Sequence, residues 1–211
     1  MNGSKTAWQK IVTGKDLVAA KRFRSKEYIV RKERTLALPD FIEEGWTKYR
    51  DYKNPKFVGI KKPKNFDEIF EDKVWSLFAN MGFTDMNSDR NFVMSYDYQN
   101  PEFTQQIDVF AADDETILFV ECKAAEDISD GKFKKAIEAL HSQMEGLRRE
   151  AQERYRGRKV KFIWATHNYI MSKADMEKLK EWGIVYFNDA VIDYYTELTK
   201  HLGTSAKYQL L

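Results

Sequence analysis

The chain has 211 residues, 43% of them apolar and 32% charged, which are the proportions of a globular protein with one substantial core and exclude a wholly disordered chain. The longest apolar runs are too short to cross a bilayer and the N-terminus carries no basic-then-apolar leader, so we expect a cytoplasmic protein with no membrane partner. An internal disulfide and a zinc motif are also excluded, because Cys122 is the single cysteine and His141, His167 and His201 lie far apart.

Residues 1–64 are basic and aromatic, and three prolines interrupt them at positions 39, 55 and 63. The net charge of the whole chain is only +2, but residues 1–35 hold ten Lys or Arg against three acids. Such a local excess of cations attracts phosphate, although a solvated charged surface is the plain alternative. We predict a basic N-terminal arm or subdomain over residues 1–64.

A helix is predicted from residue 65 to residue 81, where apolar residues recur at three- and four-residue spacing. These residues are Phe66, Ile69, Phe70, Val74, Leu77, Phe78 and Met81. Gly82 ends the helix. Asn65 and Glu68 have the offset of a capping box, which gives Glu68 a local role and leaves Glu71, at the edge of the apolar stripe, without one.

Three strands are predicted next, over residues 91–98, 105–112 and 116–123. The acidic segment 113–115 is expected to form the tight turn between the second and third of them. Together the three strands would form a meander.

The remaining predicted elements are a helix over 132–155, a strand over 160–166, a helix over 172–182, a strand over 184–187 and a last helix from 189 to about 202. Hairpin-joined strands are usually antiparallel, and strands separated by helices are usually parallel. The sequence therefore predicts an α/β fold, with a mixed central β-sheet flanked by helices, over residues 65–202. A polar tail is expected over residues 203–211.

Two charged side chains end the predicted strand 116–123. Because side chains alternate along a strand, Glu121 and Lys123 point to one face and the apolar residues, with Cys122, to the other. Cys122 is therefore interpreted as a small core residue and not as a nucleophile. Asp108 interrupts the neighbouring strand in the same way, and the short turn would bring it alongside Glu121.

Two adjacent carboxylates repel each other, and a divalent cation between them keeps both ionised. Mg²⁺ is the expected ion at Asp108 and Glu121, with Mn²⁺ able to substitute. Such an ion polarises a phosphodiester and activates water, while Lys123 could orient that water or neutralise charge. Phosphodiester hydrolysis is the reaction class that follows.

The order Glu71, Asp108, then Glu121-Cys122-Lys123 resembles the signature of the PD-(D/E)XK nuclease superfamily. The resemblance implies Mg²⁺-dependent DNA cleavage within a restriction-endonuclease-like core, and the predicted elements follow one another in the order α-β-β-β-α-β-α-β-α. It also implies that Asp108, Glu121 and Glu71 bind the metal and that Lys123 is the catalytic lysine. One departure is Ile107, which stands where the family has its proline.

Two further segments extend the resemblance to roughly residues 65–202. Residues 70–83 are similar to the first helix of Mrr-type restriction endonucleases, and residues 183–187 look like the late strand of that group. Residues 66–83 also resemble the nuclease-like N-terminal region of some DGQHR-domain proteins. That second likeness implies a longer polypeptide with a further C-terminal domain.

Other candidate residues lie on the long helix predicted over 132–155 and just beyond it. Gln143 is a candidate accessory residue, because some relatives carry a site glutamine there, although an exposed helical glutamine is the more common explanation. The candidate DNA-binding residues are Arg148, Arg149, Arg154, Arg156 and Arg158.

The leading functional hypothesis is a DNA endonuclease, such as a restriction or defence effector. The alternative is a nucleic-acid-binding module that has the same fold but whose main function lies in a missing domain or partner. A protein-interaction domain, in which Asp108, Glu121 and Lys123 form an ordinary salt-bridge network, is the third hypothesis. The sequence leaves open whether the protein forms a homodimer and whether its target is DNA or RNA.

Overall fold

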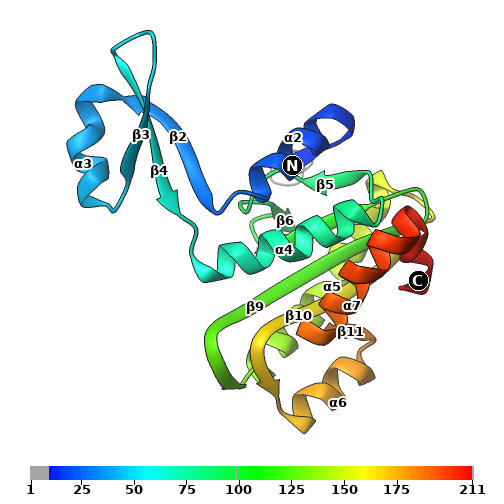
Figure 1. Cartoon of the computed structure of the whole chain (residues 1–211). Helices are drawn as coiled ribbons and strands as arrows, with labels where there is room; N and C mark the ends of the chain where they lie inside the picture. Colours follow the sequence, from blue (N-terminus) through cyan, green and yellow to red (C-terminus); the bar gives the residue numbers. More distant parts are fainter. Residues whose placement is uncertain (1–9, 98, 211) are drawn as a thin grey trace.

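A computed structural model describes residues 10–97 and 99–210 and contains a six-stranded sheet in the order β1-β5-β8-β9-β10-β11 (Figure 1). Its strands are β1 (Ile11–Val12), β5 (Asp85–Asn87), β8 (Val109–Ala112), β9 (Thr116–Gly131), β10 (Lys159–Met171) and β11 (Ile184–Phe187). The pairs β1–β5, β5–β8 and β8–β9 are antiparallel, and β9–β10 and β10–β11 are parallel. The predicted α/β fold with a mixed central sheet is confirmed; the specific restriction-endonuclease core stays a prediction.

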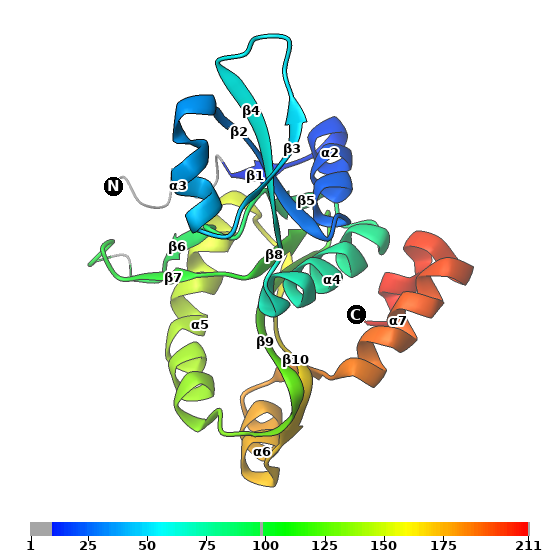
Figure 2. The same ribbon diagram turned by 60° about the vertical axis from the view of Figure 1, so that its left-hand side comes forward.

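Helices cover both faces of this sheet, as Figure 2 shows. The helices are α2 (Gly14–Arg24), α4 (Phe66–Asn80), α5 (Lys134–Arg154), α6 (Lys173–Glu181) and α7 (Asp189–Leu202). One buried cluster joins α4 and α7 to Val120 and Cys122 of β9, and another joins α5 and α6 to Phe119 of the same strand. The alternation predicted for β9 is therefore confirmed. Cys122 is 8% exposed and lies in the core, as expected.

Local signals placed the helix ends correctly. The backbone N–H of Asn65 donates to Glu68 Oε2 at 2.8 Å, which completes the predicted capping box. At the start of α6 the N-cap side chain is the acceptor, because Ser172 Oγ accepts the N–H of Asp175 at 3.1 Å. Gly82 follows α4 with a φ of +90°, a conformation that favours glycine.

The predicted three-strand meander is wrong in its first strand. Within residues 91–98, only β6 (Val93–Ser95) is a strand, and it pairs with β7 (Thr104–Gln106) in a separate two-stranded sheet; residue 98 lies outside the described residues. The neighbour of β8 in the central sheet is β5. The predicted strand 105–112 is divided between β7 and β8, because the Asp108 side chain accepts the Cys122 N–H in place of a ladder bond at that point.

A small lobe projects from the body of the molecule (Figure 1). It consists of β2 (Tyr28–Arg34), β3 (Thr47–Asp51) and β4 (Phe57–Pro63) in an antiparallel sheet of order β2-β4-β3, with α3 (Leu38–Glu43) on one face. Its core is Trp46, Val58 and Ile60. The chain segments that lead into and out of the lobe lie together, because the N–H of Lys64 donates to the carbonyl of Glu27 at 3.1 Å.

The described part of the C-terminal segment packs on the body as a 3₁₀ helix, η2 (Gly203–Gln209). Ala206 is fully buried, and Lys207 Nζ pairs with Asp113 Oδ2 of the β8–β9 turn at 2.8 Å. The predicted turn itself is confirmed, since Asp113 Oδ1 accepts the N–H groups of Glu115 and Thr116. Among the helices of residues 10–97 and 99–210, none is both long and apolar enough to cross a membrane.

Candidate active site at the end of the central hairpin

Asp108 and Glu121 come together where the β8–β9 ladder ends. Val109 pairs with Val120, and the residues just beyond this pair are Asp108 and Glu121. Asp108 Oδ2 accepts the backbone N–H of Cys122 at 2.8 Å, which ties its carboxylate to β9. Lys123 Nζ lies 2.6 Å from Glu121 Oε1. The structure thus places these three predicted site residues side by side.

A buried asparagine that the sequence analysis missed holds this end of the hairpin. Asn87 of β5 is fully buried; its Oδ1 accepts the N–H of Phe110 at 3.0 Å, and its Nδ2 donates to the carbonyl of Asp108 at 3.1 Å. Trp75 of α4 donates its indole N–H to the Asn87 carbonyl at 2.9 Å. Asn87 therefore fixes the backbone that carries Asp108. In the sequence, Asn87 stands in a polar run that is typical of a loop. Only its position between two apolar segments could have indicated that it is buried and holds the hairpin.

Burial and like charge set the ionisation of the Asp108 carboxylate. Burial raises the pKa of Asp108 to about 7, assisted by the charges of Glu121 and Glu71 and opposed by the Cys122 N–H and by Lys123. Burial alone would lower the pKa of Lys123, but the ion pair and hydrogen bond with Glu121 outweigh it, so this pKa lies above its ordinary value. The lysine is therefore a cation, and Asp108 has too little positive charge around it to be fully ionised at neutral pH.

Glu71 of α4 faces the same cluster but is held by an arginine. Its Oε2 lies 2.9 Å from Nε of Arg90, in an ion pair whose angles fall outside those of a hydrogen bond. Burial raises the pKa of Glu71, and the charges of Arg90 and Arg24 oppose this rise. Glu68, one turn earlier, has the capping role expected for it. Glu71 is therefore the acid of α4 that is close enough to act on the charge of Asp108.

A network of buried charges next to Glu71 was also missed. Asp72 is 4% exposed and meets three cations at 2.7 Å each: Arg24 of α2, Lys64 at the exit of the lobe, and Arg90 of the β5–β6 loop. The Lys64 ammonium also donates to the Arg24 carbonyl at 2.9 Å. These contacts join α2, α4, the lobe and the loop that carries Arg90. Arg90 connects this network to the candidate site, because it also pairs with Glu71.

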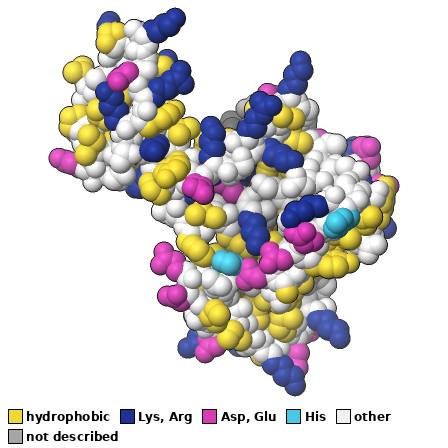
Figure 3. Space-filling view, in the orientation of Figure 1, with side chains coloured by type: hydrophobic (Ala, Val, Ile, Leu, Met, Phe, Trp, Pro, Cys, Tyr) yellow, Lys and Arg dark blue, Asp and Glu magenta, His cyan; other side chains and the backbone are white. Residues whose placement is uncertain are grey.

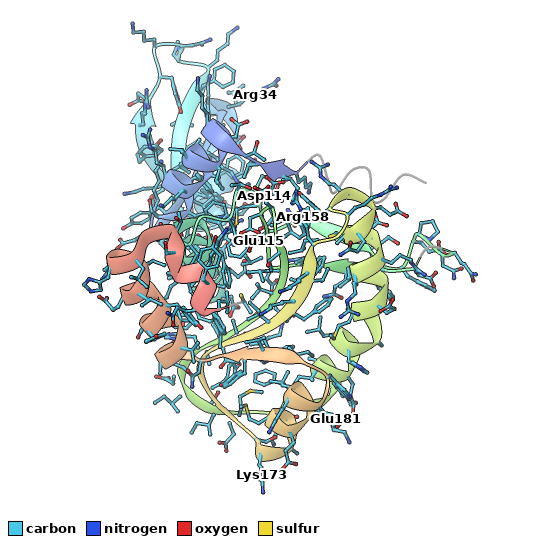
Figure 4. All side chains as sticks on the ribbon, turned by 90° about the vertical axis from the view of Figure 1, so that its right-hand side faces the viewer. Arg34, Asp114, Glu115, Arg158, Lys173 and Glu181 are labelled. Atoms are coloured by element: carbon cyan, nitrogen blue, oxygen red, sulfur yellow. The ribbon has the colours of Figure 1, made fainter. Side chains whose placement is uncertain are left out.

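The other predicted residues lie along α5 and the loop after it. Gln143 is half-buried on α5, and Arg148 pairs with Glu145 at 2.9 Å. Arg149, Arg154 and Arg156 are exposed. Arg158 stacks over the Tyr155 ring at 4.5 Å, and Figure 4 shows it beside Asp114 and Glu115.

Three of these arginines are remote from the hairpin end. Residues 154–158 lie where β9 begins, since Lys159 pairs with Thr116, and the site lies at Lys123. At about 3.3 Å per residue, the separation along the strand is about 20 Å. Arg154, Arg156 and Arg158 would therefore contact a bound nucleic acid well away from the site.

The donor set at the hairpin end fits a hard divalent cation. Asp108 and Glu121 offer carboxylate oxygens, and the raised pKa of Asp108 is that of a buried acid in need of positive charge. In residues 10–97 and 99–210, no three His, Cys, Asp or Glu side chains converge closely enough to form a ready metal cluster. Glu121 is paired with Lys123, and Glu71 with Arg90. The predicted roles of Asp108, Glu121 and Glu71 as ligands remain predictions.

Comparisons with known proteins do not assign the chain to a family. No family model and no curated protein matches it. Among solved structures, it is similar to protein VC1899 from Vibrio cholerae at a TM-score of 0.41 and 16% identity, over 94% of this chain and 53% of that one. The chain thus spans about half the length of that protein.

Proposed function

We propose that this protein is a metal-dependent nuclease that hydrolyses phosphodiester bonds in DNA. The observation that carries the proposal is the meeting of Asp108 and Glu121 at the end of the central hairpin, with the ammonium of Lys123 beside them. Paired acids that share a β-hairpin with a lysine are suited to phosphoryl chemistry, because they bind a cation where negative charge develops. The resemblance to PD-(D/E)XK nucleases of the Mrr type supports the same assignment.

Each residue has a distinct part in this proposal. Asp108 and Glu121 would hold Mg²⁺, or Mn²⁺ in its place, through carboxylate oxygens. When bound, the ion polarises the phosphodiester and lowers the pKa of a water molecule. Lys123, which its ion pair with Glu121 keeps as a cation despite burial, hydrogen-bonds the attacking water or balances charge on the phosphate oxygens. Glu71 tunes the charge of the site, because its carboxylate acts on Asp108.

The wider setting belongs to the proposal as well. A nuclease of this kind would work in the cytoplasm as a restriction or defence effector, alone or as a homodimer. Its likeness to DGQHR-domain proteins suggests a longer polypeptide in which the nuclease is the front part. A binding module without cleavage is the second candidate function, and the ion pairs that occupy Glu121 and Glu71 favour it.

A cleavage assay separates the two functions. Purified protein is incubated with plasmid DNA, single-stranded DNA and RNA, each with Mg²⁺, Mn²⁺ or EDTA. The nuclease proposal expects cleavage of at least one DNA substrate with either metal and none with EDTA. Absence of cleavage with both metals on every substrate, together with DNA binding in the same buffers, would overturn the nuclease proposal and leave the binding module.

Two glutamates on α4 provide a matched pair for testing the site. Glu71→Gln should weaken metal binding and slow cleavage, but it should not lower the melting temperature without metal, because burial already disfavours the charge of Glu71. Glu68→Gln keeps an oxygen for the Asn65 N–H and should leave cleavage nearly unchanged. Melting temperature with and without Mn²⁺, measured with the cleavage rate, tests both. If Glu68→Gln abolished cleavage and Glu71→Gln did not, the choice of acid would be wrong.

A further inference from the structure

The three-stranded sheet of the lobe has two chemically different faces. One packs on α3, and its pairs include Ile29 with Lys62 and Glu33 with Val58; we term it the α3 face. The opposite surface, the open face, carries the alternating residues of the same strands. These residues are Tyr28, Val30, Lys32 and Arg34 of β2, Phe57, Gly59, Lys61 and Pro63 of β4, and Thr47 and Arg50 of β3.

Among the strand residues of the lobe, carboxylates are found on the α3 face alone, whereas cations are on both faces: Arg31, Lys48 and Lys62 lie on the α3 face by register. The open face carries four cations, Lys32, Arg34, Arg50 and Lys61, and no carboxylate among the strand residues just named. The acids of the lobe are on the other side: Glu33 and Asp51 point to the α3 face by register, and Asp40, Glu43 and Glu44 belong to α3 and its end. Figure 3 shows Lys and Arg side chains among hydrophobic ones over the lobe, and Figure 4 marks Arg34 on it. A cationic surface of this kind suits a polyanion.

Aromatic rings lie among these cations. Lys32 Nζ is 4.4 Å from the centre of the Phe57 ring and 5.0 Å from that of Tyr52, and Lys61 Nζ is 4.6 Å from that of Tyr28. Tyr28 is 39% exposed, and Tyr49, in the bulge of β3, is 44% exposed. These rings are large and partly exposed to solvent. They are therefore available for stacking against another flat ring.

Gly59 is what lets the Tyr49 ring lie on the open face. A Cβ at position 59 would stand 2.9 Å from Cε1 of Tyr49, closer than real Cβ atoms approach, and 3.0 Å from Cβ of Arg50, which is tighter than most real contacts. Tyr49 and Arg50 therefore both cover the glycine from the open side. The sheet presents a ring and a guanidinium together at this point.

We propose that the open face binds a single-stranded segment of nucleic acid, with unpaired bases stacked on Tyr49 and Tyr28 and the backbone held by Lys32, Arg34, Arg50 and Lys61. Aromatic stacking requires bases that are free of a duplex, and alternating rings and cations suit a chain of alternating bases and phosphates. The inference rests on the proposed function in one respect: it takes the bound strand to be the substrate of the nuclease. It names that substrate as nucleic acid with single-stranded character.

The position of the lobe agrees with this assignment. The lobe leads through Lys64 into the N-terminal end of α4, the end that carries Glu68 and Glu71. A pocket of about 490 Å³ lies at this junction and is lined by Lys64, Phe66 and, just beyond Lys123 on β9, Ala124. Two residues of the open face, Tyr28 and Pro63, line a second pocket of about 510 Å³ together with Lys26, Lys64 and Lys73, so the open face continues onto α4.

Binding to labelled 20-nucleotide single-stranded DNA, the same RNA and a 20-base-pair duplex tests the proposal. Anisotropy is measured on the full chain in EDTA, over a range of salt. Single strands of both sugars should bind more tightly than the duplex. Lys32→Gln/Arg50→Gln should shrink the slope of log affinity against log salt by about 1.4, because each phosphate contact contributes about 0.7. Tyr49→Ala should weaken single-strand binding by roughly fivefold or more.

A matched double variant on the α3 face is the control. Lys48→Gln/Lys62→Gln removes the same charge from the same lobe, and it should leave the slope close to that of the wild type. Equal losses in the two double variants, no loss in Tyr49→Ala, or tighter binding to the duplex would each overturn the proposal. Because EDTA prevents cleavage, binding can succeed while the nuclease proposal fails, and the reverse outcome is equally visible.

Discussion

Replacing Asp108 with asparagine should abolish metal-dependent cleavage and at the same time stabilise the metal-free protein at alkaline pH. The amide oxygen can still accept the Cys122 N–H, so the hairpin end keeps its geometry. The lost negative charge removes an anionic ligand, and we expect a rate loss of about 100- to 1000-fold or more. Opposite effects on activity and stability are characteristic of a site residue and not of a core residue.

The sign of the stability change follows from the raised pKa. In the folded protein the pKa of Asp108 is about 7, against an ordinary value of 3.8, so the folded state retains a proton that the unfolded chain has lost. The wild type is therefore unaffected below pH 4, loses stability progressively as pH rises from about 4 through 7, and at pH 8 bears a cost of up to about 4 kcal/mol. Asparagine avoids this cost. Urea denaturation in EDTA at pH 5 and pH 8 measures the difference, and a less stable variant at pH 8 would contradict it.

Glu121→Gln and Lys123→Ala should also remove cleavage, and Asp127→Asn is the control for both. Asp127 is exposed on the same strand, beyond the site, and its neutralisation should leave the rate unchanged. Undiminished cleavage by Asp108→Ala and Glu121→Ala would place the chemistry elsewhere. Retained fold in each variant is checked by circular dichroism.

The largest loss of stability is expected for Asp72→Asn. This change leaves Arg24 and Lys64, both almost fully buried, without the carboxylate that each contacts at 2.7 Å. Removing one partner of a buried ion pair typically costs about 3–5 kcal/mol, because the remaining charges are uncompensated. Urea denaturation measures the free energy of unfolding.

Asp67→Asn is the control for Asp72→Asn. Asp67 is an exposed acid in the first turn of the same helix, where neutralisation costs at most about 1 kcal/mol through the helix dipole. Adding Arg24→Met to Asp72→Asn should recover part of the loss, since it removes one stranded cation. Equal small losses for Asp72→Asn and Asp67→Asn would show that the buried charges do not depend on Asp72.

Most of the correct predictions came from two kinds of sequence pattern: capping residues at helix ends and the alternation of side chains along strands. The capping box located the start of α4, and strand alternation placed Glu121 and Lys123 on one face beside Asp108. Both kinds of signal act between residues near in sequence or on one hairpin. The prediction failed for β5, because three residues in a polar run give no periodicity.

Long-range ion pairs and the lobe had no comparable signal. Arg24 and Asp72 are 48 residues apart, and nothing near either residue indicates the other. Strands β2 and β3 of the lobe are mostly exposed, so they lack the apolar alternation that marks a half-buried strand. Their pattern is chemical, with cations and rings on one face, and it becomes visible only once the register is known.

The contact between Glu27 and Lys64 has a consequence for how such a chain can evolve. Because the two ends of the lobe meet there, residues 28–63 form a module whose gain, loss or exchange leaves the path of α2 and α4 almost unaltered. Selection could therefore change the ligand that the lobe recognises without changing the chemistry of the β8–β9 hairpin. The same junction holds Lys64, the residue just after the module, against Asp72, so this lysine would have to stay in place when the module is exchanged.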